Sequence, residues 1–181
     1  MDRGNHYETA FAEYLHWHRI CHVAVDESRR SYLGEQSIKS LDFIVYSSDG
    51  TGLLVDVKGR RFPGGTAERP RRVWESWSTR EDIIGLQQWS SVFGPRHVGL
   101  LVFMYHLQEH CPPLAGDEDL WTWHDRRYVL RAVSVADYAR CMRVRSPRWD
   151  TVCLATTDMA RLARPFYHFL GKRTADAVLN A

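Results

Sequence analysis

The sequence predicts an α/β domain in which helices flank a mixed β-sheet. Three observations support this fold class. The Asp-Gly pair in the turn at residues 47–50 separates two β-like runs, which is a strong hairpin signal. A capped amphipathic helix is expected after residue 79, and residues 98–105 are almost continuously apolar. A hairpin followed by a helix and a buried strand implies a mixed sheet with helices on its faces.

The first sixty residues are expected to form one helix and three strands. Residues 6–19 read as an amphipathic helix, whose buried positions recur at helical spacing and are Tyr7, Phe11, Tyr14, Leu15 and His18. A short apolar run bounded by charge predicts a strand over residues 21–25. Residues 39–47 and 53–57 form the arms of the hairpin. Alternation in the first arm places Leu41, Phe43 and Val45 on the core face.

The middle of the chain is expected to contain a loop, a helix and a central strand. Residues 59–70 are rich in Gly, Pro and Arg, which is the composition of a loop. Thr79 is a suitable N-cap, and Glu81 and Asp82 lie in the first turn, where the helix dipole favours carboxylates. Gly94 and Pro95 end this helix. The apolar run at residues 98–105 is typical of a strand covered on both faces.

The C-terminal part predicts a further α/β extension. Strands are expected over residues 128–133 and 151–155, and Ser134 is expected to cap a short helix through Ala139. Residues 157–170 are predicted to be helical, with a break near Pro165 and a stop at Gly171.

Composition excludes several classes of protein. Apolar residues make up 44% and charged residues 25%, which is ordinary for a globular domain and argues against disorder. The sequence contains no apolar run long enough for a transmembrane helix and no recognisable signal peptide, so we expect a cytoplasmic protein without a membrane partner. The four cysteines are far apart and form no Cys-x-x-Cys pair, so free thiols are expected.

The net charge of +2 conceals a strong segregation. Residues 58–72 contain six basic residues against one acidic residue, and residues 126–148 contain seven arginines against one aspartate. The arginines of the first segment are candidates for binding nucleic-acid phosphates: Arg60, Arg61, Arg69, Arg71 and Arg72. The alternative for the first segment is a solvated loop with scattered arginines, and the alternative for the second is arginines that pair with the acidic surface of the chain.

The most informative residues lie in the hairpin. Asp42 is embedded in the first arm, and Asp56 and Lys58 are embedded in the second. Because side chains alternate along a strand, Asp56 and Lys58 share one face, and Asp42 is expected on the same face of the neighbouring strand. Charges within apolar strands reduce stability unless they pair or bind a metal. The alternative interpretation is a surface ion pair between Asp56 and Lys58.

Two carboxylates with bound waters suit a hard cation such as Mg²⁺ or Mn²⁺. Such a cation lowers the pKa of bound water and stabilises charge on a phosphate. Lys58 can orient the attacking water or offset negative charge in the transition state. Glu8, at the edge of the first helix's buried stripe, is the candidate for a third carboxylate.

The order of these elements and residues resembles the PD-(D/E)xK nuclease superfamily, which includes restriction endonucleases and archaeal-type Holliday junction resolvases. The resemblance covers residues 5–106 and implies a restriction-endonuclease-like αβββαβ core. It implies that Asp42 is the first-motif acid, that Asp56 and Lys58 form the Asp-x-Lys motif, and that Glu8 is the acid of the first helix. Leu41 replaces the nominal proline before Asp42. Residues 6–8, 39–43 and 54–62 are also similar to a small bacterial branch.

The resemblance implies a Mg²⁺-dependent nuclease that hydrolyses phosphodiester bonds of DNA, including structured or damaged DNA. Some branches use a polar residue on the following helix, where Gln87 and Gln88 are available. A homodimer is also implied, although no interface is readable in the sequence. A single domain is expected, with a core at 5–106, an extension at 107–171 and a fraying tail at 172–181. The alternatives are an inactive member of the fold that binds nucleic acid or protein, and an unrelated α/β domain.

Overall fold

The computed structural model describes residues 6–25, 31–33, 36–114 and 118–179. Within these ranges the chain forms a seven-stranded mixed sheet, in the order β1-β4-β5-β9-β11-β10 with β14 against β11. The parallel pair is β5 with β9, and the other pairs are antiparallel. The strands are β1 (His22–Ala24), β4 (Phe43–Tyr46), β5 (Gly52–Phe62), β9 (His97–Leu107), β10 (Leu120–Trp123), β11 (Arg126–Ser134) and β14 (Arg164–Pro165). The predicted mixed α/β sheet is confirmed.

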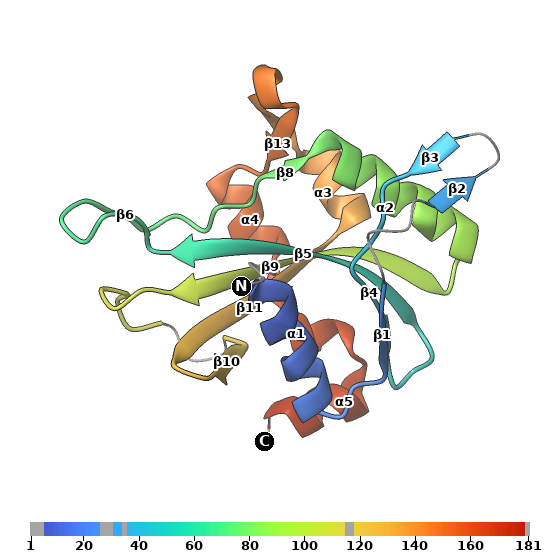
Figure 1. Cartoon of the computed structure of the whole chain (residues 1–181), viewed down its shortest axis with the longest axis horizontal. Coiled ribbons are helices and arrows are strands. Elements are labelled where there is room, and N and C mark those ends of the chain that lie inside the picture. The colour runs from blue at the N-terminus through green and yellow to red at the C-terminus, as the bar shows by residue number, and fades with distance from the viewer. Residues whose placement is uncertain (1–5, 26–30, 34–35, 115–117, 180–181) are drawn as a thin grey trace, which may run out of the picture.

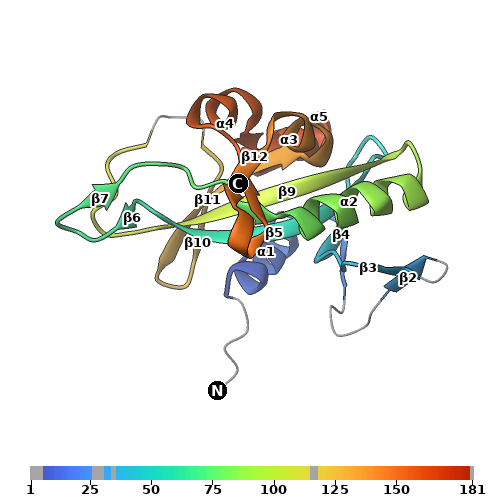
Figure 2. The same cartoon turned by 90° about the horizontal axis from the view of Figure 1, so that it is seen from above.

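Helices cover both faces of this sheet (Figures 1 and 2). One cluster of core residues lies between the sheet and α1, and a second lies between the sheet and α2, α3 and α4. The short helix η2 and helix α5 contribute to the α1-side cluster. The helices are α1 (His6–Trp17), α2 (Arg80–Phe93), α3 (Val135–Cys141), α4 (Thr156–Leu162), η2 (Phe166–Phe169) and α5 (Lys172–Leu179). None of the helices in the described ranges has the length and apolar character that membrane crossing requires.

The central strand β9 shows why the sheet is covered on both sides. Leu100, Val102 and Met104 belong to the α1-side cluster, whereas Leu101 and Phe103 belong to the other. A strand that is buried on both faces needs apolar residues at successive positions, which accounts for the unbroken apolar run. Its position in the centre of the sheet is therefore confirmed.

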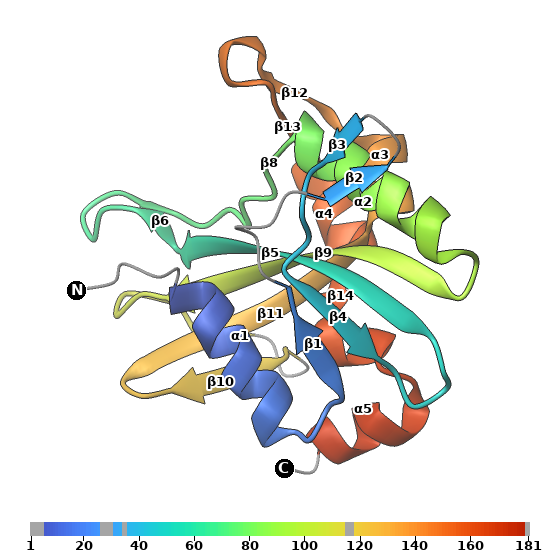
Figure 3. The same ribbon diagram turned by 45° about the vertical axis from the view of Figure 1, so that its right-hand side comes forward.

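In the described part of the chain, three small sheets lie outside the main one. The first contains β12 (Arg143–Ser146), β13 (Thr151–Cys153) and β8 (Ser78–Thr79), and the short helix η1 (Pro147–Trp149) joins β12 to β13. The second pairs β6 (Gly64–Gly65) with β7 (Pro70–Arg71), and the third pairs β2 (Ser31–Leu33) with β3 (Gln36–Ile38). In Figures 1 and 3 the β6 hairpin extends from the end of β5, and the β12–β13 hairpin projects above β8.

Two predictions about the hairpin strands are wrong. Strand β5 continues to Phe62, where the Gly- and Arg-rich composition predicts a loop from Gly59 onward. It remains in the sheet because it pairs with β9 in parallel over its whole length. Leu41 does not share a face with Phe43, because it packs in the α2-side cluster while Phe43 packs in the α1-side cluster. Strand β4 begins only at Phe43, so the alternation does not extend back to Leu41.

The helix predicted in the C-terminal part is shorter in the structure. The helix expected over residues 157–170 ends at Leu162, and Pro165 lies in β14 before the short helix η2. Proline lacks the N–H that a helix interior requires, which explains the full stop rather than a kink. The tail that is expected to fray contains α5, whose partly buried Ala175 and Val178 pack against the α1-side core.

Candidate active site

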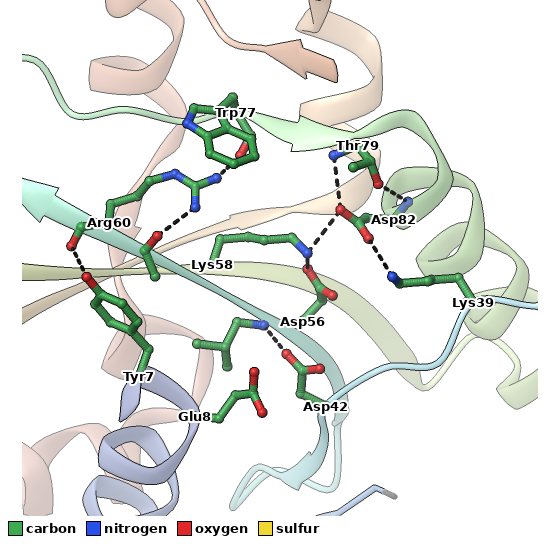
Figure 4. A pocket seen from close by; sticks show the side chains of 12 residues that line it. Tyr7, Glu8, Lys39, Asp42, Asp56, Lys58, Arg60, Trp77, Thr79 and Asp82 are labelled. Atoms are coloured by element: carbon green, nitrogen blue, oxygen red, sulfur yellow. Dashed lines mark hydrogen bonds and ion pairs between the residues drawn. The ribbon is translucent and has the colours of Figure 1, made fainter. Parts of the chain in front are cut away.

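A cavity of about 410 Å³ opens beside β5, at the point where its pairing with β4 ends (Figure 4). The last strand partners are Phe43 and Val55, so the edge of β5 beyond Asp56 faces the cavity. The walls come from α1, β5, the start of α2 and the segment before β4. The lining residues are Tyr7, Glu8, Lys39, Asp42, Asp56, Val57, Lys58, Gly59, Arg60, Trp77, Thr79 and Asp82.

The structure brings the four predicted site residues to this one cavity. Glu8 comes from the first turn of α1, and Asp42 immediately precedes β4. Asp56 and Lys58 lie on β5. The Asp42 carboxylate accepts a hydrogen bond of 2.6 Å from the backbone N–H of Val57. The Asp42 side chain thus binds an edge N–H of β5 beyond the last β4–β5 pair, which positions its carboxylate beside Asp56.

Lys58 lies between two carboxylates. Its ammonium nitrogen is 2.6 Å from Asp56 Oδ2 and 3.0 Å from Asp82 Oδ2. Burial disfavours the charged lysine, but the two neighbouring carboxylates outweigh it and raise the pKa of Lys58. The lysine is therefore an ammonium at neutral pH, which suits it to stabilise negative charge and not to accept a proton.

Asp82 is a charged site residue that the sequence prediction missed. Its carboxylate accepts hydrogen bonds from the Ser78 hydroxyl at 2.8 Å and from the Thr79 N–H at 3.0 Å. Burial would raise its pKa, but Lys58 and these hydrogen bonds lower the pKa of Asp82 to about 2. The sequence places Asp82 in the first turn of a helix capped by Thr79, and the structure shows that the two residues form a capping box. A role at the helix start is compatible with a second role at the site. Gln87 and Gln88, the residues considered on this helix, do not line the cavity.

The position of Glu8 depends on a close contact between α1 and β5. The Tyr7 ring packs over Gly59, where an added Cβ atom would lie 2.1 Å from the ring. The Tyr7 hydroxyl donates a hydrogen bond of 3.1 Å to the carbonyl of Arg60. Glycine at position 59 therefore allows the first turn of α1, with Glu8, to approach the cavity.

The arginines predicted to bind nucleic acid divide into two groups. Arg60 is only 8% exposed, its guanidinium lies 3.8 Å from the centre of the Trp77 ring, and it donates to the carbonyls of Gly59 and Trp77. The placement of Arg60 in an open loop is therefore wrong, because β5 continues through it. The other four remain exposed, although Arg71 pairs with Glu75 at 2.7 Å: Arg61, Arg69, Arg71 and Arg72.

The donor set of the cavity fits a hard divalent cation. Its carboxylates, from Glu8, Asp42, Asp56 and Asp82, offer oxygen ligands only, and Mg²⁺ is commonly held by one or two carboxylates with waters. Burial raises the pKa of Asp56 to about 6, despite the opposing effect of Lys58, and a cation would stabilise its charged form. In the described ranges, no three His, Cys, Asp or Glu side chains are grouped as a ready metal site. The cavity therefore fits a cation that is held by two carboxylates, with water and substrate as its other ligands.

Comparison of the sequence with protein-family models and with curated proteins gives no match. Among solved structures, the chain is similar to Archaeoglobus fulgidus Hjc, a Holliday junction resolvase from an archaeal hyperthermophile. The two chains are 11% identical, the match covers 93% of this chain and 100% of Hjc, and the TM-score is 0.49. Because this TM-score is below 0.5, we infer nothing about the cavity from that protein.

Proposed function

We propose that this protein is a divalent-metal-dependent nuclease that hydrolyses phosphodiester bonds of DNA. The observation that supports the proposal is the convergence of Asp42, Asp56, Lys58 and Glu8 on one cavity at the open edge of β5. These residues lie on three separate segments, and the fold alone brings them together. DNA as the substrate follows from the resemblance to the PD-(D/E)xK superfamily on these same residues.

Asp42 and Asp56 would hold Mg²⁺ or Mn²⁺, and Glu8 would bind it directly or through water. When bound, such a cation supplies an activated water and stabilises charge on the phosphate. The Val57 N–H fixes one oxygen of Asp42, so its carboxylate is oriented before any ligand arrives. Lys58, held as an ammonium by Asp56 and Asp82, offsets negative charge that develops on the phosphate.

The role of Asp82 is to position Lys58. Its carboxylate is fixed by the cap of α2, and it holds the ammonium from the side opposite β5. Because Asp82 is ionised throughout the neutral range, Lys58 keeps one anionic partner even when Asp56 turns toward a cation. Asp82 is therefore a positioning residue, and Lys58 is the group that meets the phosphate.

Cleavage assays test this proposal directly. The protein is incubated with plasmid, single-stranded and branched DNA in Mg²⁺ or Mn²⁺, and again with EDTA. We expect metal-dependent cleavage that is lost in Lys58→Ala and Asp56→Ala but retained in Asp158→Ala. Asp158 is a suitable control because it is a carboxylate outside the cavity that pairs with Arg161 at 2.9 Å. Absence of cleavage on every substrate, or cleavage that both cavity variants retain, would refute the proposal.

A second candidate is an inactive member of the same fold that binds nucleic acid or a protein. It is favoured by the ion pairs of Lys58 with Asp56 and Asp82 and by the absence, within the described ranges, of a ready three-ligand metal site. Salt-dependent DNA binding without metal-dependent cleavage would identify this function.

The homodimer and the cytoplasmic location stay predictions.

A further inference from the structure

A basic hairpin projects from the molecule next to the candidate active site. It comprises residues 143–153, which form β12, η1 and β13, and we call it the β12–β13 arm. In Figures 1 and 3 the arm rises beyond the body of the protein, above β8. The second basic segment of the sequence ends in this arm, and the proposed nuclease chemistry does not use it.

The tip of the arm presents a tryptophan to solvent. Trp149 is 68% exposed, although it lies in an ordered turn rather than at a chain end. Pro147 begins the short helix η1, and Asp150 ends it in the left-handed region, with φ 43°. Asp150 also pairs with Arg80 at 3.2 Å, which ties the tip to the start of α2. The ring is therefore accessible to a ligand, and its position is fixed by the turn and by the contact of Asp150 with Arg80.

The charge of the arm points to a polyanionic partner. Arg143, Arg145 and Arg148 are all exposed, and no carboxylate of the described residues forms an ion pair with them. The guanidinium of Arg148 lies 5.3 Å from the centre of the Trp149 ring, so a cation and an aromatic face stand together at the tip. Proteins that bind single-stranded nucleic acid use this combination, because guanidinium groups contact phosphates and aromatic rings stack on bases.

The base of the arm is built into the rim of the cavity. Strand β13 pairs with β8 through Thr151 with Thr79 and Val152 with Ser78, and Thr79 lines the cavity. The Arg145 guanidinium lies 5.3 Å from the centre of the Trp77 ring, which also lines the cavity. Figure 4 shows Trp77 and Thr79 on the same side of the site, above Lys58. A single strand of nucleic acid bound along the arm would therefore extend toward the candidate active site.

We propose that the β12–β13 arm binds DNA, with Trp149 stacked on an unpaired base and Arg143, Arg145 and Arg148 on the phosphates. This inference rests on the proposed function in one respect, since it takes DNA as the partner. It adds a substrate preference, because a stacking ring needs a base that is not already stacked within a duplex. DNA with unpaired bases, as in single strands and at branch points, is therefore the preferred ligand.

The test measures binding separately from cleavage. Fluorescent single-stranded, branched and fully duplex DNA are titrated with full-length protein in EDTA, and binding is followed by anisotropy. We expect Trp149→Ala to weaken binding of single-stranded and branched DNA by about 5- to 150-fold, the range of one lost stacking contact. Duplex binding should change by less than about twofold. Trp149→Phe should restore most of the affinity, because phenylalanine also stacks.

One matched control and two arginine variants accompany the Trp149 variants. Trp17→Ala removes a tryptophan that is 66% exposed on α1 and should leave binding unchanged. Each of Arg143→Ala and Arg148→Ala should weaken all three ligands alike and reduce the salt dependence of binding by about one released counterion. Far-ultraviolet circular dichroism establishes that every variant is folded.

The outcomes separate the inference from the proposed function. Unchanged single-strand binding by Trp149→Ala, an equal loss on duplex DNA, or an equal loss in Trp17→Ala overturns the role of the arm even if the protein cleaves DNA. No binding of any DNA by the wild-type protein also overturns it. The expected binding pattern without cleavage in Mg²⁺ or Mn²⁺ supports the arm and refutes the nuclease.

Discussion

Replacing Asp82 with asparagine tests both the site and the reasoning about its charges. Asp82 is buried, caps α2 through Thr79 and pairs with Lys58, so one carboxylate joins the start of a helix to the candidate catalytic lysine. Asparagine has nearly the same shape and keeps an oxygen for the Thr79 N–H. The substitution therefore removes the charge and leaves most of the helix cap in place.

The magnitude follows from the pKa of Asp82. The ordinary value of 3.8 falls to about 2 in the folded protein, since Lys58 and Thr79 outweigh the effect of burial. Such a lowering stabilises the folded state by about 2 kcal/mol at neutral pH. Because the folded pKa is the lower one, this stabilisation is fully present above pH 4 and is lost as the pH falls toward 2. Asp82→Asn should therefore lower the free energy of unfolding by about 2 kcal/mol at pH 7.

Urea denaturation at pH 7 and at about pH 3 measures this difference, and the cleavage assay measures its effect on Lys58. Asp137→Asn is the matched control, because Asp137 lies three residues after the cap Ser134 but pairs with Arg140 at the surface. Its effect should stay within about 1 kcal/mol at both pH values. The reasoning would be refuted if the two substitutions lowered the free energy of unfolding equally at pH 7. It would also be refuted if the loss in Asp82→Asn did not become smaller toward pH 3.

Three further predictions concern β5. Arg60→Ala should lower the free energy of unfolding by about 2 kcal/mol in urea denaturation, because its guanidinium is buried and hydrogen-bonded, whereas Arg61→Ala should only weaken DNA binding. Asp56→Asn should stabilise the metal-free protein by about 1–3 kcal/mol at pH 7, because burial raises the pKa of Asp56 to about 6. That gain should vanish as the pH falls from 6 to 4, and a loss of stability would contradict it. Gly59→Ala should cost about 1–3 kcal/mol in thermal unfolding and reduce cleavage, since the new methyl group would overlap the Tyr7 ring.

The sequence was sufficient to locate four residues that line the cavity, Glu8, Asp42, Asp56 and Lys58, but not to describe their partners. Asp42, Asp56 and Lys58 are conspicuous because charged residues rarely occupy apolar strands, and they do share a site. Their expected meeting on one face, through alternation from Leu41, was wrong in detail, because β4 starts only at Phe43. The hydrogen bond from the Val57 N–H to the Asp42 carboxylate holds Asp42 at the site instead. The alternation of side chains along a strand does not predict this contact.

The predictions that were wrong or incomplete concern residues whose contacts come from distant segments of the chain. Arg60 belongs to a Gly- and Arg-rich stretch with loop composition, yet pairing with β9 holds this stretch in the sheet and Trp77 covers its side chain. Asp82 occupies the first turn of α2, where a carboxylate stabilises the helix, and this local role explains its presence in the sequence. The sequence therefore gives no sign that Asp82 also pairs with Lys58. Its contact with Lys58 exists only because α2 begins beside the open edge of β5.

The sequence by itself predicted the mixed sheet, its central strand and the helix that Thr79 caps, and it drew attention to Asp42, Asp56 and Lys58, because periodicity, capping and turn chemistry are local. The segregation of charge behind a net value of +2 was equally readable. Only the tertiary structure decided which basic residues are buried, which carboxylate holds Lys58, and that Trp149 stands exposed on an arm at the rim of the cavity. These features depend on the pairing of strands far apart in the chain, and burial and electrostatic coupling arise only once that pairing has formed.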